Sequence, residues 1–430
     1  MKKKITLLVI GVVILLVINV TGVFNRSLTV YVDKTFPLYQ EAVQDFKKEN
    51  SAKIKIKVVT FDSYEEMKAR VNTEIMSGKG PDVLLFDSIY DVDDSFKTSA
   101  SGSLLALDEK MAELDEENYF TNILDAGIAN GHQYFLPLSW NILQAYSPQG
   151  MINEKGYSDN MFMAYAEEAV ALANDNTMGI SSNQYGRMDG SLMNYFLDVA
   201  GVEVIDWASG QLNDNKEQVL QVAEFVKVVS DNQEKNMTIA QRYANDFAGA
   251  VAHFTFLSED FPFMNNVSFY QTAYPNSVND EMHFVPYTNL EGGITAQVTQ
   301  YGAISAYTKH EDQAWELLRH ILDYESSVTF NKYIRNQLIM APVNKTVYAA
   351  YVEELANSEY NSGGQRIAPL EEKWVHVLEE IPARVNSAVI PNGAVASHIQ
   401  ECMDPYLNGQ DSFDNCYDTL TTRLQMYLDE

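Results

Sequence analysis

The chain has 430 residues, of which 46% are hydrophobic, and its formal net charge is −29. Because this length exceeds what one ordinary hydrophobic core organises, we expect two lobes or domains. The acidity argues against nucleic acid and anionic lipid as partners, since phosphate groups would be repelled, and it is typical of a well-solvated secreted surface.

The first element is an apolar run over residues 5–24, which follows lysines at positions 2–4. The run is about as long as a bilayer span. Its positive flank predicts that the N-terminus stays in the cytoplasm and that the rest of the chain is exported. Residues 1–26 are therefore expected to form a membrane anchor or a cleaved signal peptide, and the mediocre cleavage site at Val20-Thr21-Gly22 favours the anchor. No cysteine lies near this segment, which excludes the usual bacterial lipid anchor.

The next stretch alternates short apolar strands with polar helices. Strands are predicted at residues 28–32, 54–58 and 83–86, and helices at 36–46 and 63–77. The run Val83–Phe86 shows little alternation and lies between turn signals, so we expect a strand buried on both faces. The progression predicts a parallel, doubly wound lobe. Asp87 follows the third strand, at the end where open α/β sheets bind ligands.

From residue 134 to the C-terminus the sequence predicts both helices and strands. The predicted elements are a strand at 134–138, helices at 161–174 and 192–200, a hairpin-like arm at 201–210, a helix through 219–226, strands at 249–256 and 300–305, a helix around 315, and helices from 371 onward. Pro137 favours an edge or a bend in its strand, which suits a strand that leaves one lobe for another.

Several short stretches, weak one by one, carry a family resemblance through their order and spacing. They are Asp33-Lys34, residues 76–83, 102–107, 134–137, 249–252, 285–287, 302–305 with 314–316, and 341–344. Together they resemble the bacterial extracellular solute-binding proteins of sugar ABC importers, the group that includes maltose-binding protein. The resemblance runs from about Leu28 to the C-terminus.

This resemblance implies an α/β fold of the two-lobed periplasmic-binding-protein type (type II). Each lobe would hold a mainly parallel sheet flanked by helices, with a ligand cleft between the lobes and hinge closure over the ligand. The N-lobe is expected at residues 27–139 and 289–335, and the C-lobe at 140–288 and 336–430. The crossover strands would join the lobes near these boundaries.

The resemblance also implies a carbohydrate site. Sugars need hydrogen-bonding side chains for their hydroxyl groups and flat apolar faces for their C–H surfaces. In maltose-binding relatives an Asp-Lys pair after the first strand contacts sugar hydroxyls, and Asp33 and Lys34 match it in place. A solvated pair at a helix start is the alternative. Asp87 would either contact the ligand or cap a helix or turn.

Further candidates lie where the crossovers of the family meet the cleft. Trp140 suits ring stacking beside Asn141, with a core tryptophan as the alternative. Glu259 falls at the cleft edge of the C-lobe, where maltose-binding relatives carry a tryptophan that this chain lacks. Gln300 and Tyr301 precede a small-residue strand that family ligands approach closely, or they are ordinary loop residues. The aromatic residue that some maltose-binders use in the last helical segment has no counterpart here, which argues against maltodextrin as the ligand.

We therefore expect an extracellular protein that binds an oligosaccharide or sugar derivative and delivers it to the permease subunits of an ABC transporter. It would be a monomer, held to the outer face of the cell membrane by its N-terminal segment or secreted. A ligand sensor for a membrane receptor and a secreted hydrolase are the alternatives. No GxSxG, HExxH or P-loop motif occurs, so we predict neither an enzyme nor a cofactor or metal.

The two cysteines, Cys402 and Cys416, lie near the C-terminus. In an exported chain they could form a disulfide. The alternative is that both are small, buried core thiols.

Overall fold

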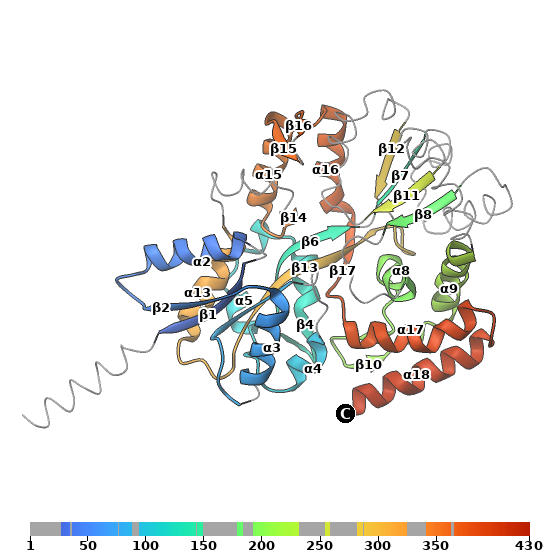
Figure 1. Cartoon of the computed structure of the whole chain (residues 1–430), viewed down its shortest axis with the longest axis horizontal. Helices are drawn as coiled ribbons and strands as arrows, with labels where there is room; N and C mark the ends of the chain where they lie inside the picture. The colour runs from blue at the N-terminus through green and yellow to red at the C-terminus, as the bar shows by residue number, and fades with distance from the viewer. Residues whose placement is uncertain are drawn as a thin grey trace, which may run out of the picture. The chain divides into compact units, whose positions relative to one another are not determined.

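The structure is a computed structural model of the whole chain (Figure 1). It describes residues 27–34, 37–75, 77–87, 94–142, 144–148, 179–183, 192–231, 254–258, 282–286, 288–324, 341–362 and 365–430. The chain divides into two compact units. Unit 1 comprises residues 1–84 and 304–321, and unit 2 comprises residues 85–303 and 322–430. The lobe boundaries expected from the sequence stay a prediction.

Unit 1 is built on parallel strands, as its sequence pattern predicted. Strand β1 (Leu28–Asp33) pairs in parallel with β2 (Ile56–Phe61) on one side and with the start of β3 (Val83–Asp87) on the other. Helices α2 (Pro37–Glu49) and α3 (Tyr64–Ile75) cover opposite faces of these strands (Figure 1). Helix α13 (Glu311–Leu322) follows later in the chain. The predicted alternation of strand and helix is confirmed.

The glycine turn before β3 is followed by Asp82, whose side chain links two other segments of unit 1. Gly78 and Gly80 adopt positive φ angles of 67° and 129°, which a residue with a Cβ rarely reaches. The Asp82 carboxylate then accepts hydrogen bonds from the Thr29 backbone N–H at 2.6 Å and from the Thr308 hydroxyl at 2.7 Å. Asp82 therefore joins β1 to the segment that leads into α13.

Unit 2 contains a second group of paired strands, most of which are fully buried. Strand β13 (Ile294–Ile304) runs antiparallel to β6 (Leu136–Ile142) and parallel to β17 (Val385–Val389), and β14 (Ala341–Pro342) pairs with the far edge of β6. Strand β6 is thus central, although Pro137 favoured an edge or a bend. The β6–β13 register is irregular between Gln300 and Tyr301, and Tyr301 is the partner of Pro137. This irregularity in the register allows the proline, which has no N–H, to lie inside a sheet.

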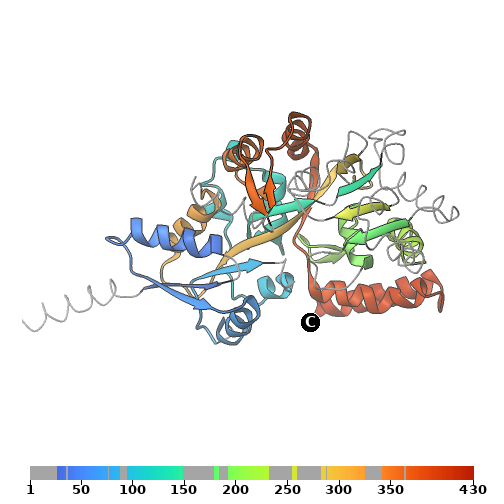
Figure 2. The ribbon, with the colours of Figure 1, turned by 45° about the horizontal axis from the view of Figure 1, so that its top comes forward.

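A helical layer forms the other large core of unit 2. It contains α8 (Leu192–Ala200), α9 (Lys216–Asp231), α17 (Gly393–Leu407) and α18 (Phe413–Asp429), and both views show α17 and α18 side by side (Figures 1 and 2). The predicted arm is present as β9 (Ile205–Asp206) paired with β10 (Gln211–Leu212). Cys402 and Cys416 are free thiols buried in this core, so no disulfide joins them in this structure.

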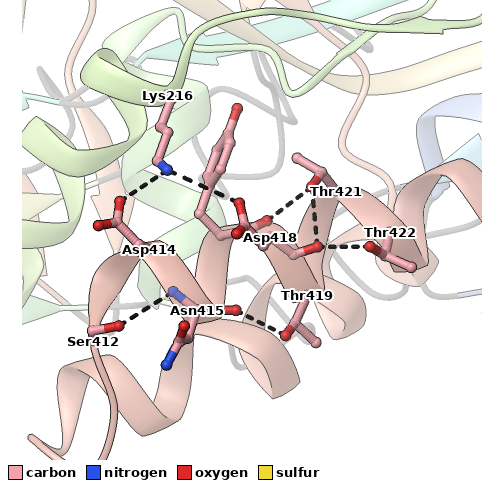
Figure 3. Close-up of polar contacts among 9 residues, drawn as sticks. Lys216, Ser412, Asp414, Asn415, Asp418, Thr419, Thr421 and Thr422 are labelled. Carbon is pink, nitrogen blue, oxygen red and sulfur yellow. Dashed lines mark hydrogen bonds and ion pairs between the residues drawn. The ribbon is translucent and has the colours of Figure 1, made fainter.

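The start of α18 is held by polar contacts (Figure 3). The Ser412 hydroxyl caps the helix by accepting a hydrogen bond from the Asn415 N–H at 3.3 Å. The Lys216 ammonium group, at the start of α9, lies 2.8 Å from the Asp414 carboxylate and 4.0 Å from that of Asp418. These ion pairs therefore tie the first turn of α9 to that of α18.

The smaller elements of unit 2 include a mixed sheet in the order β12-β7-β11-β8. Its strands are β7 (Gln144–Pro148), β8 (Gly179–Asn183), β11 (Phe254–Ser258) and β12 (Met282–Pro286). The remaining elements are α4 (Ser95–Ala100), α5 (Asp108–Met111), η1 (Glu116–Asn118), α6 (Thr121–Leu124), η2 (Asp125–Gly127), β4 (Ile128–Ala129), β5 (His132–Gln133), α15 (Lys345–Asn357), β15 (Tyr360–Ser362), β16 (Gln365–Ile367) and α16 (Glu372–Arg384).

Some sequence predictions fall on other parts of the chain. The N-terminal segment 1–26 and the helix at 161–174 lie outside the described residues. Within the described ranges, no helix combines the length and the apolar character needed to cross a bilayer.

Candidate functional site

Unit 1 contributes two of the predicted ligand-binding residues. Asp33 ends β1 and is buried, and its backbone carbonyl accepts a hydrogen bond from the Gln40 side-chain amide at 2.7 Å. Lys34 extends toward solvent and forms an ion pair with Asp62. The hydrogen bond between them raises the pKa of Lys34 and lowers that of Asp62. A sugar hydroxyl would therefore compete with Asp62 for the Lys34 ammonium group.

A buried chain of polar side chains lies in unit 2 where β13 passes the end of β3. The Gln300 side-chain amide donates a hydrogen bond to the Asp87 carboxylate at 3.3 Å. At its other end, the Gln300 carbonyl oxygen accepts from the Ser139 hydroxyl at 2.6 Å. The Ser139 oxygen is also 2.9 Å from the Thr299 hydroxyl. Since Ser139 has one hydroxyl hydrogen, which it gives to Gln300, Thr299 donates to Ser139. We call these four residues the polar chain.

The structure thus brings Asp87 and Gln300 together, and their role in ligand binding stays a prediction. Sequence reasoning did not select Ser139 or Thr299. Only the pairing of β6 with β13 reveals these two residues, because it makes Ser139 the partner of Gln300. This register cannot be predicted from the sequence of either strand alone.

Trp140 lies in the core of unit 2. Its side chain has no exposed surface, and its indole N–H donates a hydrogen bond to the Pro342 carbonyl oxygen at 3.1 Å. Its ring stacks on Tyr348 with centroids 6.0 Å apart and an interplanar angle of 23°. The neighbouring Asn141 points to the opposite face of β6, because side chains alternate along a strand. The ligand roles of Trp140 and Asn141 stay predictions, and in this conformation no face of the Trp140 ring is open to a sugar.

Glu259, another predicted ligand-binding residue, lies outside the described residues.

Tyr301 belongs to an aromatic cluster. The Tyr301 ring stacks on Phe86, with centroids 4.9 Å apart and an interplanar angle of 14°, and meets the edge of Phe135 at 5.3 Å. Tyr301 is 1% exposed, so its polar or stacking contact with a ligand also stays a prediction.

A family model described as bacterial extracellular solute-binding protein matches residues 41–359. The chain belongs to this family, as the resemblance of its motifs predicted. No curated protein matches the chain.

Solved structures support the fold class. The sugar-binding protein MalE from Xanthomonas citri is similar with a TM-score of 0.65 and 14% identity, over 94% of this chain and 98% of that chain. A putative oligosaccharide periplasmic-binding protein from Synechococcus has a TM-score of 0.62 and 15% identity, over 94% and 99%. The GacH receptor of Streptomyces glaucescens, described unliganded and in complex with acarbose, has a TM-score of 0.57 and 16% identity, over 94% and 100%.

These likenesses confirm the predicted α/β fold of the type II periplasmic-binding-protein class. Family membership makes the chain a solute-binding protein rather than an enzyme, and the family acts outside the cytoplasm, in the extracellular or periplasmic space.

Proposed function

We propose that this protein is the substrate-binding component of an ABC transporter and that its solute is a carbohydrate, either an oligosaccharide or a sugar derivative. The family match over residues 41–359 carries the proposal. Further support comes from structural neighbours whose descriptions name α-D-tagatose, acarbose and cycloalternan as bound molecules. The protein would hand its ligand to a membrane permease.

The proposed site uses the polar side chains that the sequence singled out. Carboxylates and amides are the groups that hydrogen-bond sugar hydroxyls. Asp87 and Gln300 already hold each other in place, so binding would cost little additional side-chain entropy there. The full proposed set is Asp33, Lys34, Asp87, Trp140, Asn141, Glu259, Gln300 and Tyr301.

Capture is proposed to involve hinge closure around the ligand. A ligand favours a closed state only by making contacts that are better there than in the open state. We further propose that the protein acts as a monomer and that residues 1–26 tether it to the outer face of the membrane or direct its export.

A thermal-shift screen of mono- and oligosaccharides on the purified protein tests the proposal. A ligand that is about 100-fold more concentrated than its Kd should stabilise the protein by about 2.7 kcal/mol. The Asp87→Asn variant should lose most of the shift, because it weakens the acceptor that the site offers. Glu109→Gln, which removes an exposed acid of α5, is the matched control and should keep the shift.

The carbohydrate assignment fails if no sugar changes the melting temperature while a peptide or a metal ion does. If a sugar does stabilise the protein and Asp87→Asn responds like the control, the assignment holds but Asp87 is not in the site.

A further inference from the structure

Unit 2 contains a cavity of about 350 Å³ that shares no residue with the proposed carbohydrate site. Its wall is built from α4, the α6–β4 segment, the arm around β9, and β17. This volume lies at the lower end of the range typical of small-molecule sites. It therefore suits a compact ligand rather than an oligosaccharide. The residues that determine its chemistry are Phe96, Asp125, Glu203, Asp206 and Trp207.

The charges on this wall are all negative. Asp125, Glu203 and Asp206 line the cavity, and no Lys, Arg or His is among its described lining residues. Two asparagine amides of the wall are already engaged, since Asn122 donates to the Val385 carbonyl and Asn386 accepts from Asn289 at 2.7 Å. The cavity therefore offers acceptors and negative potential to an occupant, and a cation would be drawn into it.

Glu203 is the acid that most needs a partner. Within the described part of the chain, no side chain or N–H group donates a hydrogen bond to its carboxyl group. Burial raises its pKa to about 7, and the nearby charges of Asp198 and Asp206 add to the effect. Asp206 differs, because the Ser209 hydroxyl donates to its carboxylate at 2.5 Å and lowers its pKa. Burial also raises the pKa of Asp125, with a contribution from the charge of Glu116.

An aromatic pair completes the wall. The rings of Phe96 and Trp207 lie 5.4 Å apart, inclined by 52°, and both line the cavity. The faces of such rings attract ammonium groups, and the attraction grows where water is excluded. Hydrogen-bond acceptors, unbalanced negative charge and aromatic rings on the wall of one cavity match the chemistry of an organic ammonium ion.

We propose that this cavity is a second binding site, which takes a small aliphatic amine in its ammonium form. Glu203 supplies the carboxylate for the ammonium group, and Trp207 and Phe96 contact its aliphatic carbons. The site is separate from the carbohydrate site, so either one can be refuted without affecting the other.

Isothermal titration calorimetry of the full chain with 1,4-diaminobutane tests this site, with 1,4-butanediol as the uncharged control of equal length. The diamine should bind and the diol should not. Glu203→Gln should weaken diamine binding roughly tenfold or more, because the variant keeps the shape and removes the charge. Glu217→Gln removes an exposed acid of α9 outside the cavity and should bind like the wild type.

The pH dependence of the wild type provides a second readout that needs no variant. Diamine binding should weaken as the pH falls below about 7, where Glu203 becomes protonated. No diamine binding at millimolar concentration, equal binding by Glu203→Gln, or equal binding of the diol would overturn the proposal. A similar loss in both variants would also overturn it, because it would indicate attraction to the overall negative charge.

Discussion

Replacing Glu203 with glutamine should stabilise the protein strongly at pH 9 and only about a third as much at pH 5. In the folded state burial raises the pKa of this carboxyl group from 4.5 to about 7. An acid whose pKa is raised on folding contributes stability below its unfolded pKa, and this contribution is lost as the pH rises through the folded value. The contribution of Glu203 to wild-type stability therefore declines between about pH 4.5 and pH 7, and Glu203→Gln lacks this decline.

The size of the effect follows from the two pKa values. The difference of about 2.5, at about 1.4 kcal/mol for each pKa unit, gives a maximum of about 3 kcal/mol. Linkage predicts a gain for Glu203→Gln of about 1 kcal/mol at pH 5 and about 3 kcal/mol at pH 9. Such a gain is unusual for a single substitution, since most substitutions destabilise a protein.

Urea denaturation at both pH values, followed by tryptophan fluorescence, measures the difference. Glu217→Gln changes the net charge equally at an exposed position and should shift the free energy of unfolding by no more than about 0.5 kcal/mol. A gain for Glu203→Gln that is the same at both pH values would refute the reasoning, because it could not come from ionisation. So would a loss of stability at pH 9.

Three further substitutions test the packing of the fold by the same denaturation assay. Trp140→Ala should cost about 3 to 5 kcal/mol because the ring is fully buried, and a loss below about 1 kcal/mol would contradict its core position. Gly127→Ala should destabilise by more than about 2 kcal/mol or abolish folding, because the new Cβ would lie 2.0 Å from the Phe135 carbonyl oxygen; near-wild-type stability would contradict this geometry. Lys216→Ala should cost less than about 1 kcal/mol, since its partner Asp414 is largely exposed, and high salt should reduce the difference from the wild type.

The elements of unit 1 could be predicted because their signals are local. The run Val83–Phe86 is apolar, short and preceded by a glycine turn, and these features suffice for a strand covered on both faces. The arm after α8 could also be predicted, because Gly201 and Gly210 punctuate it and both adopt positive φ angles. Short-range periodicity and turn residues specify such elements without any long-range information.

The orientation of side chains on β6 could not be predicted in the same way. Every residue from Leu136 to Ile142 is buried, so the strand shows no alternation that would tell one face from the other. Trp140 and Asn141 were both reasonable candidates, yet strand geometry puts them on opposite faces. Helix α15 covers the Trp140 face through Tyr348, a contact between residues more than two hundred positions apart.

Glu203 was missed because its local sequence resembles an ordinary arm. It lies between Val202 and Val204, where an acid in an alternating strand usually faces solvent. Only the fold encloses it, by bringing β17 and the α6–β4 segment beside the arm as walls of one cavity. Its altered pKa therefore arises from tertiary structure, and a pattern within ten residues could not have revealed it.

The polar chain restricts what Gln300 can contribute to the proposed site. Burying polar groups is costly unless each finds a partner, and here Gln300 is held at both ends, by Asp87 and by Ser139. A glutamine amide has two N–H donors, so at most one remains for a sugar hydroxyl after the bond to Asp87. If the proposed site is used for sugars, Gln300 would therefore mainly orient Asp87, and Ser139 would set the direction in which Gln300 points.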